Sequence, residues 1–299
     1  MNLRTFILFL IPTLIWGSTW FVIKFQLGEV DPLLSVSWRF LIAGALLMVY
    51  CKAKGLNMKF SYKEHGLMLL LGLSLFGLNY WMVYEAELIL PSGMVAILFS
   101  LIIFTNIFFN AVLLKGPVRK EVVMGAIMGI VGTVMIFGDD LLNFSLENDT
   151  YLALLLCLGG ITFASLGNIT SAYNQKKKIP ILQANAFAMI YGGAMMFLIV
   201  LVLGKPIGFD TSLSYLFSLG YLSVFGSIIA FSVYLKLLGE IGPDRSVYVA
   251  LIAPAIALLI STLFEGYEWK LMGILGVLFL MLGNVMALKN KLIKKRIQT

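Results

Sequence analysis

Polar and aromatic side chains recur within the long apolar runs of this sequence, at spacings that place them on single helix faces. In residues 5–25, Trp16, Trp20 and Lys24 follow one another at intervals of four, so a helix would present them on one side. Amides, hydroxyls and aromatic rings of this kind form hydrogen bonds and apolar contacts with a solute. They therefore indicate a binding site and not a catalytic one. The candidate solute-binding residues are Trp16, Thr19, Trp20, Arg39, Asn79, Tyr80, Tyr84, Ser100, Asn106, Thr162, Ser165, Asn168 and Tyr248.

Arg39 is a charged residue well inside an apolar run, about 10 Å from the nearer end of its predicted helix at 1.5 Å per residue. A central arginine costs roughly 2.5–3.5 kcal/mol on membrane-insertion scales, so its position needs a physical reason. One interpretation is a cation that binds a carboxylate or gates access. The other, which we favour from sequence, is a side chain that extends to the lipid headgroups or to Glu29.

The sequence lacks the patterns of catalytic chemistry. It contains no HExxH, GxSxG or Walker A motif, and the acidic pair Asp139 and Asp140 falls in a loop between apolar runs. An intramembrane enzyme is therefore disfavoured, and no cofactor or metal is expected. An ion channel is disfavoured because no filter-like repeat or ring of charges is present. A receptor or a purely structural membrane protein is disfavoured because it would not need the two similar halves described below.

Ionisable groups that could relay protons are also scarce. No Asp or Glu lies near the centre of an apolar run, Glu85 is the nearest, and the single histidine, His65, stands at the start of one. Proton pumps use intramembrane carboxylates or histidines for this purpose. We therefore expect facilitated diffusion or exchange down a solute gradient.

The elements that position these residues follow from composition. Of 299 residues, 60% are hydrophobic and 12% are charged, against about 25% charged in soluble domains. A membrane-spanning helix uses roughly 20 residues. The apolar runs are residues 5–25, 33–51, 66–84, 92–114, 121–138, 151–172, 182–203, 214–236, 246–264 and 271–288. They predict an all-α polytopic membrane protein of ten transmembrane helices, the first of them too long for a typical signal peptide.

Basic residues test this arrangement. When the loops are assigned to alternate sides, 18 of the 22 Lys and Arg residues fall on one side. By the positive-inside rule that side is the cytoplasm, so both termini are expected there, in a multi-pass protein of the bacterial inner membrane. The net charge of +7 therefore reflects topology, and no nucleic-acid partner is expected.

The two halves of the chain resemble each other at an offset of about 148 to 152 residues. Glycine pairs seven residues apart close each half, Gly125 with Gly132 and Gly276 with Gly283. This predicts two five-helix repeats, residues 5–138 and 151–288. Because five is odd, the repeats must insert in opposite orientations, a construction that recurs in alternating-access transporters with a binding cavity between the repeats.

Several short patterns carry a resemblance to one family. They are Trp16-Gly17-Ser18 with Lys24, Arg39-Phe40, Pro243 followed by Pro254, Phe264-Glu265, and the glycine-spaced helices that close each half. Over residues 5–290 the chain resembles the EamA-like branch of the drug/metabolite transporter superfamily. The resemblance implies movement of small metabolites through a central cavity, often export of amino acids or drugs. Import or exchange of a cofactor-like or nucleoside-like metabolite is the alternative.

The expected partners are a small solute and the lipid bilayer. Gly125 and Gly129 form a GxxxG pair, which permits close approach of two backbones. Such a pair either joins two copies of the chain or packs within one. We favour packing within the bundle and hence a monomer, with a homodimer as the alternative.

Overall fold

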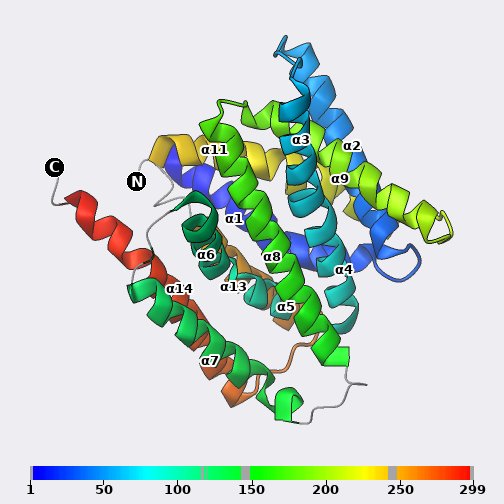
Figure 1. The fold of residues 1–299 in the computed structure, drawn as a ribbon. Helices are drawn as coiled ribbons and strands as arrows, with labels where there is room; N and C mark the ends of the chain where they lie inside the picture. Colours follow the sequence, from blue (N-terminus) through cyan, green and yellow to red (C-terminus); the bar gives the residue numbers. More distant parts are fainter. Residues whose placement is uncertain (1–2, 116–117, 119, 143–148, 242–247, 297–299) are drawn as a thin grey trace. The chain divides into compact units, whose positions relative to one another are not determined.

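The computed structural model describes residues 3–115, 118, 120–142, 149–241 and 248–296, and these residues form helices joined by short connections. The helices are α1 (Leu3–Ile23), α2 (Pro32–Ala53), α3 (Tyr62–Leu71), α4 (Asn79–Ile89), α5 (Ser92–Phe99), α6 (Ile102–Leu114), α7 (Lys120–Leu142), α8 (Asp149–Lys176), α9 (Ile181–Val202), α10 (Leu213–Tyr221), α11 (Ala230–Ile241), α13 (Tyr248–Phe264) and α14 (Leu271–Arg296) (Figure 1). Three further helical segments are wound differently from an α-helix. They are the 3-10 helix η1 (Lys24–Gln26), which is wound more tightly, and the wider π-helices η2 (Gly72–Leu78) and η3 (Leu222–Ile229).

The prediction of an all-α polytopic membrane protein is confirmed. In the part of the chain that the structure describes, eight helical segments are long and apolar enough to cross a bilayer, and two shorter apolar helices follow, Val249–Phe264 and Leu271–Ala287. Each of the ten predicted runs corresponds to one of these segments. The largest difference is in the third, where α3, η2 and α4 continue as one apolar segment to Ile89, five residues beyond the predicted end at residue 84.

Side chains fix several helix starts. Asp31 accepts a hydrogen bond from the Leu33 amide at 3.0 Å, and Pro32 occupies the first turn of α2, where its missing N–H costs nothing. Ser61 and Glu64 form a reciprocal capping box at the start of α3. These caps supply partners for amides that the first turn of a helix leaves unpaired.

The described residues divide into two compact units. Unit 1 contains Met1–Phe21, Ile89–Cys157 and Val233–Thr299, and unit 2 contains Val22–Leu88 and Leu158–Ser232. Each unit therefore takes helices from both halves of the sequence.

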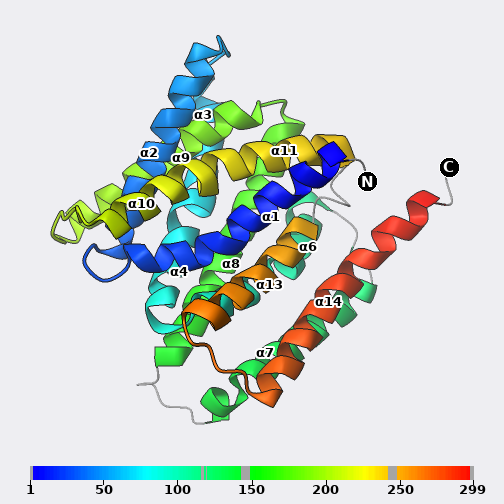
Figure 2. The same ribbon diagram turned by 180° about the vertical axis from the view of Figure 1, so that it is seen from behind.

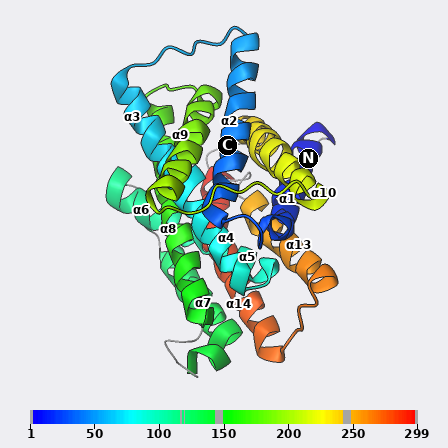
Figure 3. The ribbon, with the colours of Figure 1, turned by 90° about the vertical axis from the view of Figure 1, so that its right-hand side faces the viewer.

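In unit 2, α9 packs against both α2 and α3 (Figure 3). A Cβ added at Gly44 would lie 2.9 Å from the amide nitrogen of Ile190, and one added at Gly193 would lie 2.9 Å from that of Leu41. Ile190 and Gly193 stand 149 residues after Leu41 and Gly44. The two contacts are therefore images of each other under exchange of the halves.

In unit 1, α7 and α14 lie side by side along their length, as Figures 1 and 2 show. A Cβ at Gly132 would lie 2.5 Å from the Gly276 carbonyl oxygen, and one at Gly276 would lie 2.6 Å from that of Gly132. Gly125 and Gly283 face each other in the same way. The Gly125 face of the GxxxG pair is thus used within the chain, as we favoured from sequence.

The two π-helices begin 150 residues apart, at Gly72 and Leu222, and both lie in unit 2. A π-helix adds one residue to a helical turn, so it turns the following residues onto a different face. Each of these segments therefore sets the direction of the helix after it, α4 after η2 and α11 after η3.

The close approach of α7 and α14 predicts a sharp difference between two glycines of α14. Gly276→Ala should lower the free energy of unfolding by about 1–3 kcal/mol, because its methyl group would overlap backbone atoms of α7. Gly273→Ala, whose Cβ would meet only the Tyr267 hydroxyl at 3.5 Å, is the matched control. Thermal unfolding in detergent compares the two variants. Equal midpoints would contradict the proposed packing.

Candidate functional site

A buried arginine forms the centre of a polar group within unit 2. Arg39 lies on α2 with 1% of its surface exposed. Its Nη1 atom donates to the Tyr84 hydroxyl and its Nε atom donates to the Ser227 hydroxyl, each at 3.4 Å. The guanidinium carbon lies 4.4 Å from the centre of the Tyr80 ring and 5.0 Å from that of Phe40. The charge is therefore held by two hydroxyls and two aromatic faces.

Helical spacing explains two of these partners. Tyr80 and Tyr84 are four residues apart on α4, so they lie on one face and meet the same guanidinium. The structure thus brings together three of the predicted binding residues, Arg39, Tyr80 and Tyr84.

The π-helix η3 supplies the opposite side of the group. The Ser227 hydroxyl donates to the carbonyl of Leu222, five residues earlier, which is the spacing of a π-helix. The Ser223 hydroxyl donates to the backbone carbonyl of Arg39 at 3.1 Å. The widened turn therefore places two hydroxyls of one helix against the side chain and the backbone of Arg39.

Further hydrogen bonds extend the group toward the α1–α2 connection. The Tyr84 hydroxyl donates to the Gln26 side-chain oxygen at 2.9 Å. The Ser35 hydroxyl donates to the backbone carbonyl of Gln26 and lies 3.1 Å from the Tyr215 hydroxyl. Every one of these residues is buried, so water does not compete for the bonds.

A second cation and a carboxylate lie beside this group. Glu87, on the last turns of α4, is fully buried, and the Lys24 ammonium donates to its backbone carbonyl. Glu87 follows Tyr84 by three residues on α4, about one turn further along the same helix. In the described part of the chain, no carboxylate lies within ion-pairing distance of Arg39 itself.

The favoured interpretation of Arg39 as a side chain that extends to the headgroups or to Glu29 is wrong. A snorkelling side chain keeps its charged end in water, whereas this one is enclosed by protein and hydrogen-bonded to α4 and η3. The physical reason is that Tyr80, Tyr84 and Ser227 provide partners at the depth of the guanidinium.

The structure places other predicted residues in unit 1, where they make separate contacts. The Trp16 ring packs against Tyr234 at 5.2 Å, and the Trp20 ring packs against Phe99 at the same distance. The Ser100 hydroxyl accepts a hydrogen bond from the Asn284 amide at 2.9 Å. These residues therefore contribute to helix packing in unit 1.

Three of the remaining predicted residues form hydrogen bonds along their own helical segments. The hydroxyls of Thr19 and Thr162, and the Asn79 amide, donate to carbonyls of their own helices. Asn106 and Asn168 are half-buried and Ser165 is buried. For Tyr248 the structure describes the helical backbone but not the side chain, and Pro243 lies outside the described residues.

Sequence reasoning missed several members of the group, namely Gln26, Ser35, Tyr215, Ser223, Ser227 and Glu87. The predicted third run ends at residue 84, where the sequence becomes polar, whereas α4 continues to Ile89 and includes Glu87. The sequence did contain a signal for the longer helix. Pro91 disfavours helical geometry in the residue before it, so it indicates a helix end close to residue 90 and not at Tyr84. Glu85 and Glu87 both lie within α4, and Glu87 is a buried carboxylate near the end of that helix.

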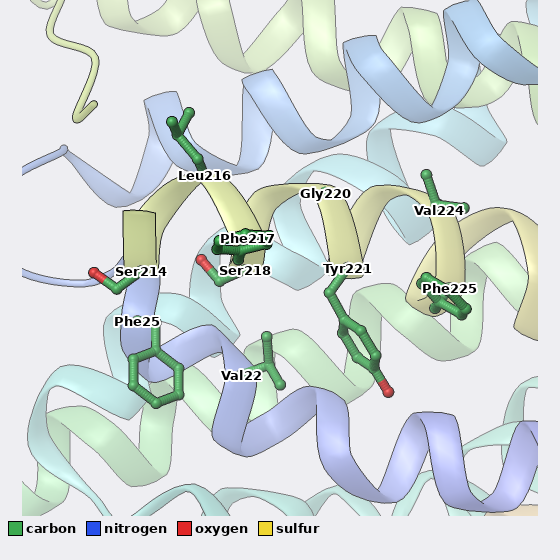
Figure 4. A pocket seen from close by; sticks show the side chains of 10 residues that line it. All are labelled: Val22, Phe25, Ser214, Leu216, Phe217, Ser218, Gly220, Tyr221, Val224 and Phe225. Carbon is green, nitrogen blue, oxygen red and sulfur yellow. The ribbon is translucent and has the colours of Figure 1, made fainter. Parts of the chain in front are cut away.

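Unit 2 also contains an apolar groove of about 680 Å³. Its walls come from the end of α1 with η1 on one side and from α10 with η3 on the other (Figure 4). Phe25, Phe217, Tyr221 and Phe225 supply the aromatic lining, and no charged side chain takes part. The groove suits an apolar ligand and offers nothing to pair a charge.

Comparison with known proteins identifies the family. The EamA-like transporter family matches residues 3–138 and 150–289 of the chain. The chain belongs to the EamA-like transporter family. A transporter of the Escherichia coli inner membrane, YedA of strain K12, is 29% identical over 88% of this chain and 85% of its own length. YoaV of Bacillus subtilis is 24% identical over 92% and 93% of the two chains.

Two further proteins are similar to this chain. The protein PecM of Dickeya dadantii is 26% identical over 89% of this chain and 86% of its own. A solved crystal structure aligns over the full length of both chains with a TM-score of 0.68 and 18% identity, a likeness of fold. This EamA-like chain is therefore a multi-pass integral membrane transporter, and its family indicates transport of a small solute instead of catalysis.

The aromatic face beneath Arg39 predicts a difference between two substitutions. Tyr80→Leu should lower the free energy of unfolding by about 2 kcal/mol more than Tyr80→Phe, because phenylalanine keeps the ring under the desolvated guanidinium and leucine removes it. Unfolding by denaturing detergent, followed by circular dichroism, measures both variants. If the two variants lost the same stability, the ring would contribute nothing to holding the charge.

Proposed function

We propose that this transporter exports amino acids or related amphipathic solutes by alternating access, and that Arg39 binds the solute carboxylate. The observation that carries the proposal is a buried guanidinium held by neutral groups. Its two hydroxyl partners lie at 3.4 Å, long for hydrogen bonds to a cation, and in the described residues no carboxylate pairs with it. A solute carboxylate would supply the missing bidentate partner.

The charges of the group support the same solute class. Lys24 and Arg39 are cations and Glu87 is the one carboxylate among the group members described above, so their formal charge sum is positive. A positive group in a low-dielectric surrounding attracts an anion strongly. The aromatic faces of Phe40 and Tyr80 would receive an apolar part of the solute.

Burial of Arg39 is compatible with transport only if the group opens. In the described conformation the guanidinium is 1% exposed, so this conformation does not admit a solute to it. Alternating access supplies such an opening, since each state exposes the site to one side of the membrane and closes it to the other. The π-helices η2 and η3, which lead into the residues around Arg39, are suitable places for the movement.

Two inverted five-helix repeats, residues 5–138 and 151–288, would provide the two states. The paired contacts of Gly44 with Ile190 and of Leu41 with Gly193 support this arrangement, as do those of Gly132 with Gly276 and the matched π-helices. Helices related by a two-fold axis in the membrane plane give such reciprocal contacts. The direction of export rests on the family resemblance, because a symmetric carrier runs both ways and gradients decide.

Two repeats of five helices place both termini on one side of the membrane, and the distribution of Lys and Arg predicts that this side is the cytoplasmic face of a bacterial inner membrane. A cysteine introduced at Asn2 or at Thr299, in a chain with Cys51 and Cys157 replaced by serine, should resist a membrane-impermeant maleimide in intact cells and react after lysis. A cysteine at Glu29, in the α1–α2 connection, is the matched control and should react in intact cells. Opposite behaviour of the two termini would rule out the arrangement.

The carboxylate proposal is tested by changing the arginine and the solute together. In proteoliposome counterflow, Arg39→Gln should reduce leucine exchange at least about tenfold, the effect of losing one charge-assisted pair. Exchange of leucinamide, which lacks the carboxylate, should be slow in the parent protein and change little. Arg39→Lys keeps the positive charge but lacks the planar guanidinium, so its rate of leucine exchange should lie between those of the parent protein and Arg39→Gln.

Outcomes of this experiment separate the alternatives. Equal loss of leucine and leucinamide exchange would assign Arg39 a structural role and overturn the carboxylate site. Uridine exchange by the parent protein, with no leucine exchange, would favour the nucleoside-like solute. Leucine accumulation driven by a pH gradient alone would contradict the expected movement down a solute gradient.

A further inference from the structure

We propose that Gln26 determines specificity for the solute, and that its side-chain amide donates a hydrogen bond to the same carboxylate that Arg39 binds. This inference rests on the proposed function and adds a second residue to the carboxylate site. Gln26 ends η1, at the connection between α1 and α2, and 1% of its surface is exposed. Among the residues that the structure describes, the Nε2 atom of its side chain has no hydrogen-bond partner.

The Tyr84 hydroxyl fixes the orientation of this amide. The hydroxyl accepts a hydrogen bond from Arg39 Nη1 at 3.4 Å, so its own proton is available to another acceptor. It donates this proton to the Oε1 atom of Gln26 at 2.9 Å. The oxygen of the amide is therefore used, and the N–H groups of Nε2 remain. One hydroxyl group links the amide to the guanidinium, so both side chains belong to the same hydrogen-bonded chain.

The backbone of Gln26 is held in place as well. The Ser35 hydroxyl donates to the Gln26 backbone carbonyl at 3.4 Å. The turn of η1 is closed by the Leu27 amide, which donates to the Lys24 carbonyl at 3.3 Å. The side chain is thus bonded to Tyr84 at one atom and carried by a fixed turn. A donor held in this way loses little conformational freedom when an acceptor arrives.

A carboxylate satisfies the unused donor of this amide. A buried N–H group without a partner has lost its hydrogen bonds to water and gained none from the protein, so it destabilises the closed conformation. The two oxygens of a carboxylate accept about four hydrogen bonds, and a bidentate arginine uses two of them. A carboxylate bound to Arg39 therefore has acceptor positions left for the Gln26 amide, whereas an ammonium or hydrocarbon end of a solute has none.

Other buried polar atoms of the described residues also lack partners, and one of them provides a control. The side-chain nitrogen and oxygen of Asn174, near the end of α8, are both buried without a hydrogen bond. The Asn174 amide therefore has no bond to Tyr84, whereas the Gln26 amide has one. The connection to Arg39 through Tyr84, together with the unused donor, is what assigns Gln26 to the solute.

Proteoliposome counterflow of leucine tests this assignment. Gln26→Met should raise the KM for leucine about tenfold, the effect of losing one hydrogen bond to a charged group, and should change the maximal exchange rate little. Gln26→Glu keeps an acceptor for Tyr84 but replaces the donor by a negative charge, so it should raise the KM further. Asn174→Leu is the matched control and should exchange leucine as the parent protein does.

Each result decides the proposal. An unchanged KM in Gln26→Met, beside loss of leucine exchange in Arg39→Gln, would overturn the role of Gln26 and leave the carboxylate site intact. Unaltered exchange in Arg39→Gln would contradict the proposed function and this inference together. Equal losses in Gln26→Met and Asn174→Leu, or a lower maximal rate at the parent KM, would assign the amide a structural role and overturn the proposal. Thermal melting in detergent checks that the variants fold, and Gln26→Glu carries the test if Gln26→Met unfolds.

Discussion

A guanidinium enclosed within a membrane-spanning segment must find its hydrogen-bond acceptors in the protein, because lipid hydrocarbon supplies none. In this transporter that requirement is met by Tyr84 from α4 and Ser227 from η3, with the Tyr80 ring beneath the charge. Three helical segments are thereby fixed around Arg39. The same partners are neutral, so the charge is held in place without being cancelled. This combination is what makes the group suitable for an anionic part of a solute.

Helix packing around this group depends on small residues at matched positions. Gly44 and Gly193 allow α2 and α9 to approach closely in unit 2, and Gly132 and Gly276 do the same for α7 and α14 in unit 1. Without a hydrophobic driving force between helices in lipid, such close contact is a main source of association. The reciprocal form of these contacts within each unit is the feature that a duplicated, inverted sequence would produce.

The sequence allowed the ten apolar segments and the position of Arg39 inside one of them to be predicted, because hydropathy determines both. The partners from α10–η3 could not be predicted. The π-helix shifts the register by one residue, so a regular helical projection misplaces Ser227. Trp16, Trp20 and Ser100 make contacts with neighbouring helices of their unit, and their place in a cavity stays a prediction. Residue type alone does not distinguish these two roles.

The central claim is that the parent protein recognises a solute carboxylate. Equilibrium dialysis of radiolabelled leucine against the purified, unaltered transporter measures this directly, with unlabelled leucine analogues as competitors. The account predicts saturable binding that norleucine displaces and that isoamylamine and leucinamide, which lack a free carboxylate, do not. Equal displacement by the carboxylate and by its neutral or cationic analogues would contradict it.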